Sequence, residues 1–232
     1  MFTLTNKIKT FSITLIVLGL LGIAYGFYSA PSTIEEAKEI VASSHHDDGH
    51  SSSYDNHSDE AKGHDEHGNG HEMSHDEHVF HQLANRPWAA IYVAAFFFFM
   101  ISLGTLAFYA IQRAAQAGWS PLLFRVMEGI TGYLLPGGLI VLALLLFSAL
   151  HFNHMFIWMD PEVVEHDEII KNKSGYLNIP FFLARGVFYL AGWSIYRYFS
   201  RKFSIAQDKA NDNSNHIKNF KISAGFLAFF IV

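Results

Sequence analysis

The stretch from residue 148 to residue 185 gathers the residue types that could do chemistry beside long apolar runs. His151 and His154 stand three residues apart, so on a helix both imidazoles would share one face, as in an H-x-x-H metal pair. Arg185 lies eight residues into the following apolar run, about 12 Å along a helix. A cation at that depth in a membrane needs a partner or a function. We expect Arg185 to reach toward His151 or Asp160, or to pair with a carboxylate from another part of the assembly.

These two histidines could in principle hold a metal, ligate a heme or exchange protons. The chain has no cysteine, which excludes disulfides, thiolate zinc sites and Cys-ligated iron–sulfur clusters. His151 and His154 alone supply half of a metal site, and a heme needs axial histidines inside the bundle. Protonatable groups at a membrane surface, with Asp160 behind them, fit proton exchange better. Interfacial anchoring is the alternative interpretation.

A second charged pair, Arg125 and Glu128, stands at the other end of the apolar run that leads to His151. The spacing of three places both residues on one helix face, where they could simply pair with each other near the interface. The functional alternative is the entrance of a polar path, carried by Glu128 because a carboxylate cannot reach the interface as easily as an arginine. Tyr133, about one turn beyond, is a weaker member. The 23 residues from Glu128 to His151 span about 34 Å of helix, so other groups must bridge that gap.

The densest histidine cluster lies elsewhere, between residues 45 and 81, which hold ten of the fourteen histidines. The run 71–75 matches H-E-x-x-H, the zinc-protease signature, which requires a helix that presents both histidines on one face. In a tract so rich in His and Glu the match is of the kind that chance produces. One interpretation of this tract is a solvated acidic loop with little direct function. The functional interpretation is loose binding of zinc, nickel or copper. The weak metal candidates are His64, His67, His71, His75 and His78.

Composition places these residues in a membrane protein. Half of the residues are apolar, 22 of them are Phe, and they come in blocks long enough to cross a bilayer core, which takes about 20 helical residues. We predict an all-α integral membrane protein, a helical bundle with four full spans and the start of a fifth. No basic patch indicates nucleic-acid binding. The predicted spans cover residues 11–30, 88–112, 122–150 and 177–198, and a fifth apolar run starts at residue 222.

The segments between the spans have distinct compositions. The first span is interpreted as a retained anchor, because its apolar run is long for a signal peptide and Tyr28 is a poor residue three before a cleavage site. Thr33 and Glu36 predict a capping box for a short amphipathic helix, and residues 45–81 predict a largely disordered loop. Pro136 and the two following glycines are expected to bend the third span. The predicted segments are a first span (1–30), a His-rich loop (31–87), spans two to four (88–199) with an outer turn (151–176), a basic loop (200–221) and the start of a fifth span (222–232).

The basic residues alternate between the predicted loops in a way that fixes an orientation. They gather before span one, between spans two and three, and after span four, which predicts a cytoplasmic N-terminus with the His-rich loop and outer turn in the periplasm. The fifth apolar run is too short to cross a bilayer, so we expect this chain to be the N-terminal portion of a longer protein.

One block in this region is more specific than any single residue. Lys173–Phe182 reads K-S-G-Y-L-N-I-P-F-F and is followed by Arg185, with the His151/His154 pair upstream and Ser204, Gln207 and Asp208 downstream. In these features the chain, from about Trp88 onward, resembles the ActF family, quinone-binding subunit 2 of the quinol:cytochrome c oxidoreductase called alternative complex III. That family is related to the NrfD/polysulfide-reductase membrane subunits. The His-rich loop is not part of the resemblance.

The resemblance implies a ten-helix bundle of NrfD-like type in the bacterial cytoplasmic membrane. It implies a non-redox subunit that binds no cofactor itself, with quinol or menaquinol, heme c and iron–sulfur clusters in partner subunits. The implied partners are an NrfD-like sister subunit, heme c and iron–sulfur subunits and membrane lipid, with a terminal oxidase as a further candidate. Such a subunit scaffolds a quinol-oxidising complex and offers a proton path. The resemblance carries over Glu128, His151, His154, Asp160 and Arg185 as path candidates, to which the spacing argument adds Arg125 and Tyr133.

Two other functions are open at this point. A divalent-metal transporter or metal-binding membrane protein would use the His-rich loop as a collector, and it predicts paired His or Asp ligands within the spans. The sequence has no such pair within them. A purely structural anchor for peripheral redox subunits is the third function, and sequence does not separate it from the first.

Overall fold

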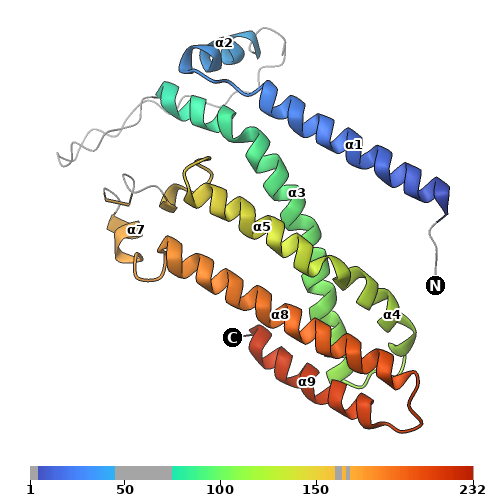
Figure 1. The fold of residues 1–232 in the computed structure, drawn as a ribbon. Coiled ribbons are helices and arrows are strands. Elements are labelled where there is room, and N and C mark those ends of the chain that lie inside the picture. Colours follow the sequence, from blue (N-terminus) through green and yellow to red (C-terminus); the bar gives the residue numbers. More distant parts are fainter. Residues whose placement is uncertain (1–4, 45–74, 160–163, 166–167, 232) are drawn as a thin grey trace, which may run out of the picture. The chain divides into compact units, whose positions relative to one another are not determined.

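The computed structural model describes residues 5–44, 75–159, 164–165 and 168–231, which are helical and contain no strand (Figure 1). Four of the helical stretches are long and apolar enough to cross a membrane. This part of the chain forms two compact units, Met1–Ala89 with Asn153–Met155, and Ala90–Phe152 with Phe156–Val232. The helices are α1 (Asn6–Tyr28), α2 (Ile34–Ser44), α3 (His75–Ala114), α4 (Pro121–Ile130), the 3-10 turn η1 (Thr131–Tyr133), α5 (Leu134–Ala149), η2 (Ile157–Met159), α7 (Glu168–Asn172), α8 (Ile179–Gln207) and α9 (Ser214–Ile231).

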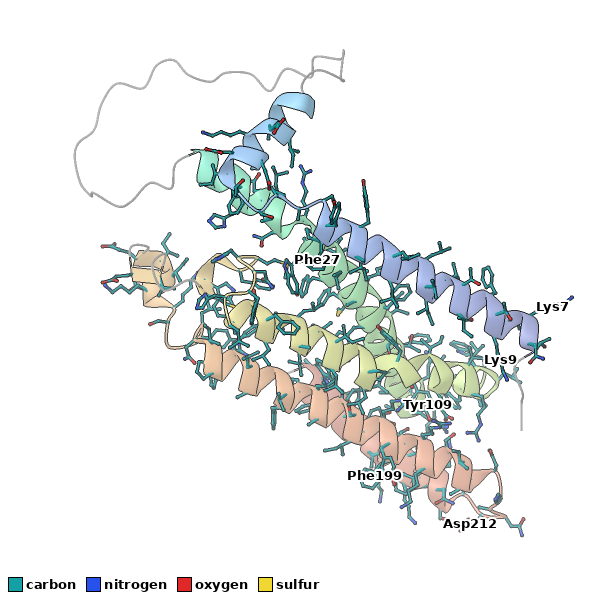
Figure 2. All side chains as sticks on the ribbon, turned by 45° about the horizontal axis from the view of Figure 1, so that its top comes forward. Lys7, Lys9, Phe27, Tyr109, Phe199 and Asp212 are labelled. Carbon is teal, nitrogen blue, oxygen red and sulfur yellow. The ribbon has the colours of Figure 1, made fainter. Side chains whose placement is uncertain are left out.

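The first unit contains the predicted anchor and the short capped helix. Helix α1 is apolar on all sides and buries no residue, as expected of a helix that meets lipid. Before α2, the Glu36 backbone N–H donates to Thr33 Oγ1 at 3.4 Å, while the Glu36 carboxylate accepts from the Ser32 N–H at 2.8 Å. The predicted cap is therefore present, except that the Glu36 carboxylate accepts from the Ser32 N–H and not from the Thr33 N–H. At the other end of this unit the rings of Phe27 and Trp88 meet edge to face at 5.1 Å; Phe27 is labelled in Figure 2.

Helix α3 begins thirteen residues before the predicted start at Trp88. The expectation of disorder up to residue 81 is wrong for residues 75–81, which are helical. Pro87 lies inside the helix without ending it.

The third predicted span is built from α4, η1 and α5, and its irregularity lies earlier than predicted. The 3-10 turn at Thr131–Tyr133 precedes Pro136 instead of coinciding with it. A proline has no N–H for the carbonyl four residues before it, and its ring crowds that carbonyl, which belongs here to Gly132. The predicted irregularity of this span is therefore present, but it lies at residues 131–133, about one turn before Pro136. Gly138 serves packing, since an added Cβ would collide with the Leu190 side chain of α8.

Helices α8 and α9 are antiparallel neighbours and are both longer than predicted (Figure 1). Asn178 caps α8 by accepting from the Phe181 N–H at 2.9 Å. The helix then continues nine residues past the expected end at Tyr198, and α9 starts eight residues before the expected Ile222. The predicted basic loop 200–221 is thus largely helical, and the connection shrinks to residues 208–213. Within this stretch Ser200, Ser204 and Asn219 are buried, with partners on neighbouring helices. The basic residues Arg201 and Lys202 lie on α8 as well, but they are exposed.

Candidate functional site

A buried polar cluster lies in the second unit, where four helix ends meet. Each helix contributes two polar residues spaced three or four apart, so both members of a pair share one face. These eight residues, called the polar cluster below, are Tyr109 and Arg113 of α3, Arg125 and Glu128 of α4, Ser200 and Ser204 of α8, and Asn219 and Ser223 of α9.

The Tyr109 hydroxyl is the centre of the cluster, and the residue is labelled in Figure 2. Its O–H donates to Glu128 Oε1 at 3.2 Å, and its oxygen accepts from Arg113 Nε at 3.1 Å. Ser200 Oγ lies 3.3 Å and Asn219 Nδ2 3.5 Å from the same oxygen. One phenol therefore contacts polar groups from all four helices.

The Glu128 carboxylate is 7% exposed, although it belongs to a candidate membrane span. It lies seven residues after Pro121, about 10 Å from the start of α4. Arg125 Nη1 donates to its second oxygen at 2.9 Å. The Arg125 guanidinium, which is partly exposed, also contacts the Asp208 carboxylate and the Ser204 carbonyl. Arg125 thus bridges a buried carboxylate and an exposed one.

Arg113 is equally buried, at 7% exposure, but its partners are neutral. Its Nη2 donates to Ser204 Oγ at 3.1 Å, and its Nε donates to the Tyr109 hydroxyl. The guanidinium carbon lies 3.8 Å from the centre of the Phe124 ring, a cation–π contact that partly replaces lost hydration. With Asp208 at the rim, two arginines face two carboxylates, so the group is neutral overall only when Glu128 is ionised.

The α8–α9 side of the cluster consists of neutral hydrogen bonds. Ser200 Oγ donates to Asn219 Oδ1 at 2.7 Å, and Asn219 Nδ2 donates to the Ser200 carbonyl at 3.1 Å. Ser223 Oγ lies 2.8 Å from the Tyr196 hydroxyl. Tyr196 in turn stacks on Phe226 with ring centres 3.9 Å apart. This side fixes the pair of helices against each other and orients the groups around Tyr109.

The sequence-predicted residues separate into two sets. Arg125 and Glu128 pair with each other, as their spacing predicted, and both belong to the polar cluster. Tyr133 does not join them: its ring is partly exposed and lies 6.5 Å from the Phe98 ring. Asp160 lies outside the described residues.

His151 is exposed and has a structural task at the end of α5. Its φ of 59° is left-handed, and the Phe152 N–H donates to the Phe147 carbonyl at 3.1 Å. The His151 N–H donates to the Ser148 carbonyl, also at 3.1 Å. Together with the edge-to-face contact of Phe147 and Phe152, this is a Schellman motif. The C-terminal cap thus accounts for the backbone of His151, and nothing in this geometry joins its imidazole to the polar cluster.

Among the described residues Arg185 meets aromatic rings, and no contact with His151 is present. The other expected partners, Asp160 and a carboxylate from another part of the assembly, lie outside the described residues. The Arg185 guanidinium carbon lies 3.8 Å from the centre of the Tyr176 ring and 5.3 Å from that of Phe181. Its Nη1 is buried and makes no hydrogen bond within the described part of the chain. Cation–π stacking therefore accounts for most of the environment of this arginine.

The same geometry explains much of the Lys173–Phe182 block. Asn178 caps α8, its Nδ2 donates to the carbonyls of Ser174 and Gly175 at 3.3 and 3.2 Å, and Pro180 occupies the first turn. Tyr176 provides the ring under the arginine. The block is a helix-start structure that also holds an intramembrane cation.

The cluster residues that sequence analysis did not name as site candidates share one pattern. They are polar pairs four apart near the ends of apolar runs: Tyr109 with Arg113, Ser200 with Ser204, and Asn219 with Ser223. A search for such spacing at span ends would have found them.

The structure describes the backbone of only two of the five weak metal candidates. His64, His67 and His71 lie outside the described residues, while His75 and His78 begin α3. Among the described side chains no group of three or more His, Asp or Glu is placed to hold a metal. The other candidate histidine, His154, lies in the first unit, where its ring meets that of His81.

Neither a protein-family model nor a curated protein matches this chain. The resemblance carried by Lys173–Phe182 and Arg185 therefore stays a hypothesis about family.

Proposed function

We propose that this chain is a non-redox membrane subunit of a quinol-oxidising respiratory complex and that the polar cluster around Glu128 is the entrance of a proton path. The proton path is proposed because the Glu128 carboxylate, 7% exposed, lies inside a candidate membrane span and accepts a hydrogen bond from a tyrosine hydroxyl. Ionisable groups in such positions are costly, and they commonly serve ion or proton movement.

The cluster supports both protonation states of Glu128. In the ionised state the carboxylate accepts from Arg125 and from Tyr109. When it is protonated, Arg125 keeps its second carboxylate, Asp208, at the exposed rim. A proton that arrives at Glu128 therefore does not leave an arginine without a partner, which keeps the cost of switching low. Proton transfer needs such groups within hydrogen-bond reach or one water away.

The rest of the route would run along α8. Three buried polar atoms on this helix lack a hydrogen-bond partner within the described residues: Arg185 Nη1, Trp193 Nε1 and Ser194 Oγ. Buried polar groups of this kind are commonly satisfied by ordered water, which needs two to four polar neighbours. Water at Trp193 and Ser194 would shorten the gap of about 34 Å between Glu128 and the far end of α5.

The respiratory complex is proposed on the resemblance of the Lys173–Phe182 block. The partners would be an NrfD-like sister subunit and subunits that carry heme c and iron–sulfur clusters, with quinol oxidised outside this chain. The positive-inside rule would place the Arg113–Arg125 end of the bundle in the bacterial cytoplasm. The polar cluster then opens toward the side from which protons are taken up.

Purified complex in liposomes tests the proposal. Glu128→Gln retains hydrogen-bonding groups in its amide but cannot carry a proton. We expect it to reduce, by at least tenfold, the protons moved per quinol beyond the two that quinol oxidation itself releases. Glu168→Gln on the exposed α7 is the matched control and should change nothing. If Glu128→Gln leaves both quinol oxidation and proton release unchanged, the path is wrong. If the purified chain brings no heme-containing or iron–sulfur subunit with it, the proposed complex is wrong.

A further inference from the structure

Arg197 and Arg201, called the α8 arginine pair below, lie one turn apart on α8 and are not members of the polar cluster. Residues four apart share a helix face, so the two side chains are neighbours. Among the described residues neither arginine forms an ion pair with a carboxylate. Like charges one turn apart repel each other, so this helix face carries a charge that an anion would stabilise.

The carboxylates of the neighbouring polar cluster and its rim are already paired. One oxygen of Glu128 accepts from the Tyr109 hydroxyl and the other from Arg125. Asp208 contacts the guanidinium of the same Arg125. These two carboxylates balance the two arginines of the polar cluster. The α8 arginine pair therefore adds two positive charges for which the described carboxylates of this region have no capacity left.

One of the two guanidinium groups is held in a fixed position. Arg197 Nε donates to Thr131 Oγ1 at 3.3 Å, and the buried Thr131 hydroxyl in turn donates to the Glu128 carbonyl at 3.0 Å. Arg197 Nη2 lies over Gly132, 3.6 Å from the place of an added Cβ. Within the described part of the chain the two Nη nitrogens make no hydrogen bond, and they are not enclosed as Arg185 Nη1 is. Two N–H groups of such a fork match two oxygens of a phosphate.

The α8 arginine pair lies at the depth of lipid phosphates. Arg197 and Arg201 follow Ile179, the first residue of α8, by 18 and 22 residues, or about 27 and 33 Å along the helix. The hydrocarbon core of a bilayer is about 30 Å thick, so a helix that starts at one interface brings the pair to the other. Exposed side chains nearby, Tyr198 on α8 and Ile130 on α4, offer apolar surface to acyl chains.

We propose that the α8 arginine pair binds the phosphate of an anionic phospholipid, with Arg197 donating from both Nη nitrogens and Arg201 from the next turn. Basic pockets between membrane helices bind anionic headgroups in this way. A zwitterionic headgroup would bring an ammonium toward two uncompensated arginines, so a lipid with net negative charge is favoured. Flexible arginines at an interface meet phosphates of every lipid, whereas the fixed Nε of Arg197 and its neighbour of like charge make this position selective. The inference does not depend on the proposed respiratory function.

Quenching of tryptophan fluorescence by lipids with brominated acyl chains measures the selectivity. Trp193 lies one turn before Arg197 on α8, close enough to report a lipid at this position. The full chain is titrated in mixed micelles with brominated phosphatidylglycerol or phosphatidylcholine at an ionic strength of about 1 M. The screening length there is about 3 Å, so general attraction between charges is suppressed while direct contacts persist. We expect phosphatidylglycerol to quench at a mole fraction at least tenfold lower than phosphatidylcholine.

Substitutions on α8 locate the site. Arg197→Gln and Arg201→Gln should each reduce the preference for phosphatidylglycerol at least fivefold. Arg197→Lys should also reduce it, because an ammonium keeps the charge but lacks the two-pronged geometry. Lys202→Gln is the matched control: it removes one positive charge from the next residue, which is exposed and lies on another face of the helix, and it should leave the preference unchanged.

Arg201→Gln keeps the test decisive if loss of the Thr131 bond unfolds Arg197→Gln, because Arg201 is exposed and has no hydrogen bond or ion pair with any described residue. Equal quenching of the unmodified chain by both lipids would overturn the site. So would an equal loss of preference in Arg201→Gln and Lys202→Gln. If inorganic phosphate displaces brominated phosphatidylglycerol completely, the arginines take a free anion and the lipid assignment is wrong.

Discussion

Replacement of Tyr109 with phenylalanine removes one oxygen from the centre of the polar cluster. That oxygen accepts from Arg113 and donates to Glu128, at 3.1 and 3.2 Å. Both partners are buried, and both carry charge. The ring itself stays in place against Phe124, so packing is nearly unchanged and the variant isolates the hydroxyl.

The magnitude follows from the two charged partners. A hydrogen bond to a charged group contributes about 1.5–3 kcal/mol, and a buried charged group that loses its partner is costly. Neutral hydrogen bonds between membrane helices contribute about 0.6 kcal/mol on average, because the unfolded chain in the membrane also finds partners. We therefore expect Tyr109→Phe to lower the free energy of unfolding by about 3 kcal/mol. Tyr196→Phe, a similarly buried tyrosine whose hydroxyl hydrogen-bonds with the neutral Ser223 and Ser200, should lower it by about 0.6 kcal/mol per bond.

Reversible unfolding in mixed micelles, followed by circular dichroism, measures both variants under one condition. Tyr198→Phe, on the exposed side of α8, gives the baseline for loss of a phenol without loss of a partner. The reasoning is refuted if Tyr109→Phe costs no more than Tyr196→Phe, since the central position of the Tyr109 oxygen would then have no energetic meaning.

Three further outcomes follow from local geometry. His151→Gly should stabilise the fold by about 1 kcal/mol, because glycine relieves the strain of the left-handed φ, whereas His151→Ala keeps that strain and should change stability little; equal melting temperatures of the two variants would contradict this. Asn178→Ala should cost about 1 kcal/mol in thermal unfolding through loss of the α8 cap, whereas Asn178→Asp should retain the cap; equal losses in both would argue against it. Gly138→Val should lower the melting temperature far more than Gly104→Val, where an added Cβ meets nothing within 4 Å, and similar effects would show that close approach to Leu190 is unimportant.

The spans could be predicted because apolar blocks of about 20 residues leave little choice of structure. The ends of the spans could not be predicted in the same way, because polar residues after an apolar run indicate that the span has ended. At Ser200 and Ser204 the helix continues, since the hydroxyls have partners on α3 and α9. Those partners lie 91 and 19 residues away and are visible only in three dimensions.

The site was predictable in part for the same reason. Arg125 and Glu128 are neighbours along one helix, so their pairing follows from spacing alone. Tyr109 is recognisable only once α4, α8 and α9 surround it. Arg185 shows the converse: the expectation of a charged partner overlooked Tyr176, because an aromatic face can stabilise a guanidinium without any opposite charge.

The order in which the polar cluster is completed has a consequence for biogenesis. Arg113 enters the membrane with α3, yet its partner Ser204 is synthesised 91 residues later. At about 5–20 residues per second, that interval is roughly 5–20 s. During this interval the contacts of Arg113 and Glu128 with Tyr109, Arg125 and Phe124 can already form. Asn219 of α9 joins the cluster later still. Helices α3 and α4 of this protein therefore enter the membrane with polar side chains whose hydrogen bonds are incomplete. The insertion machinery must keep these side chains away from lipid until α8 and α9 have been synthesised.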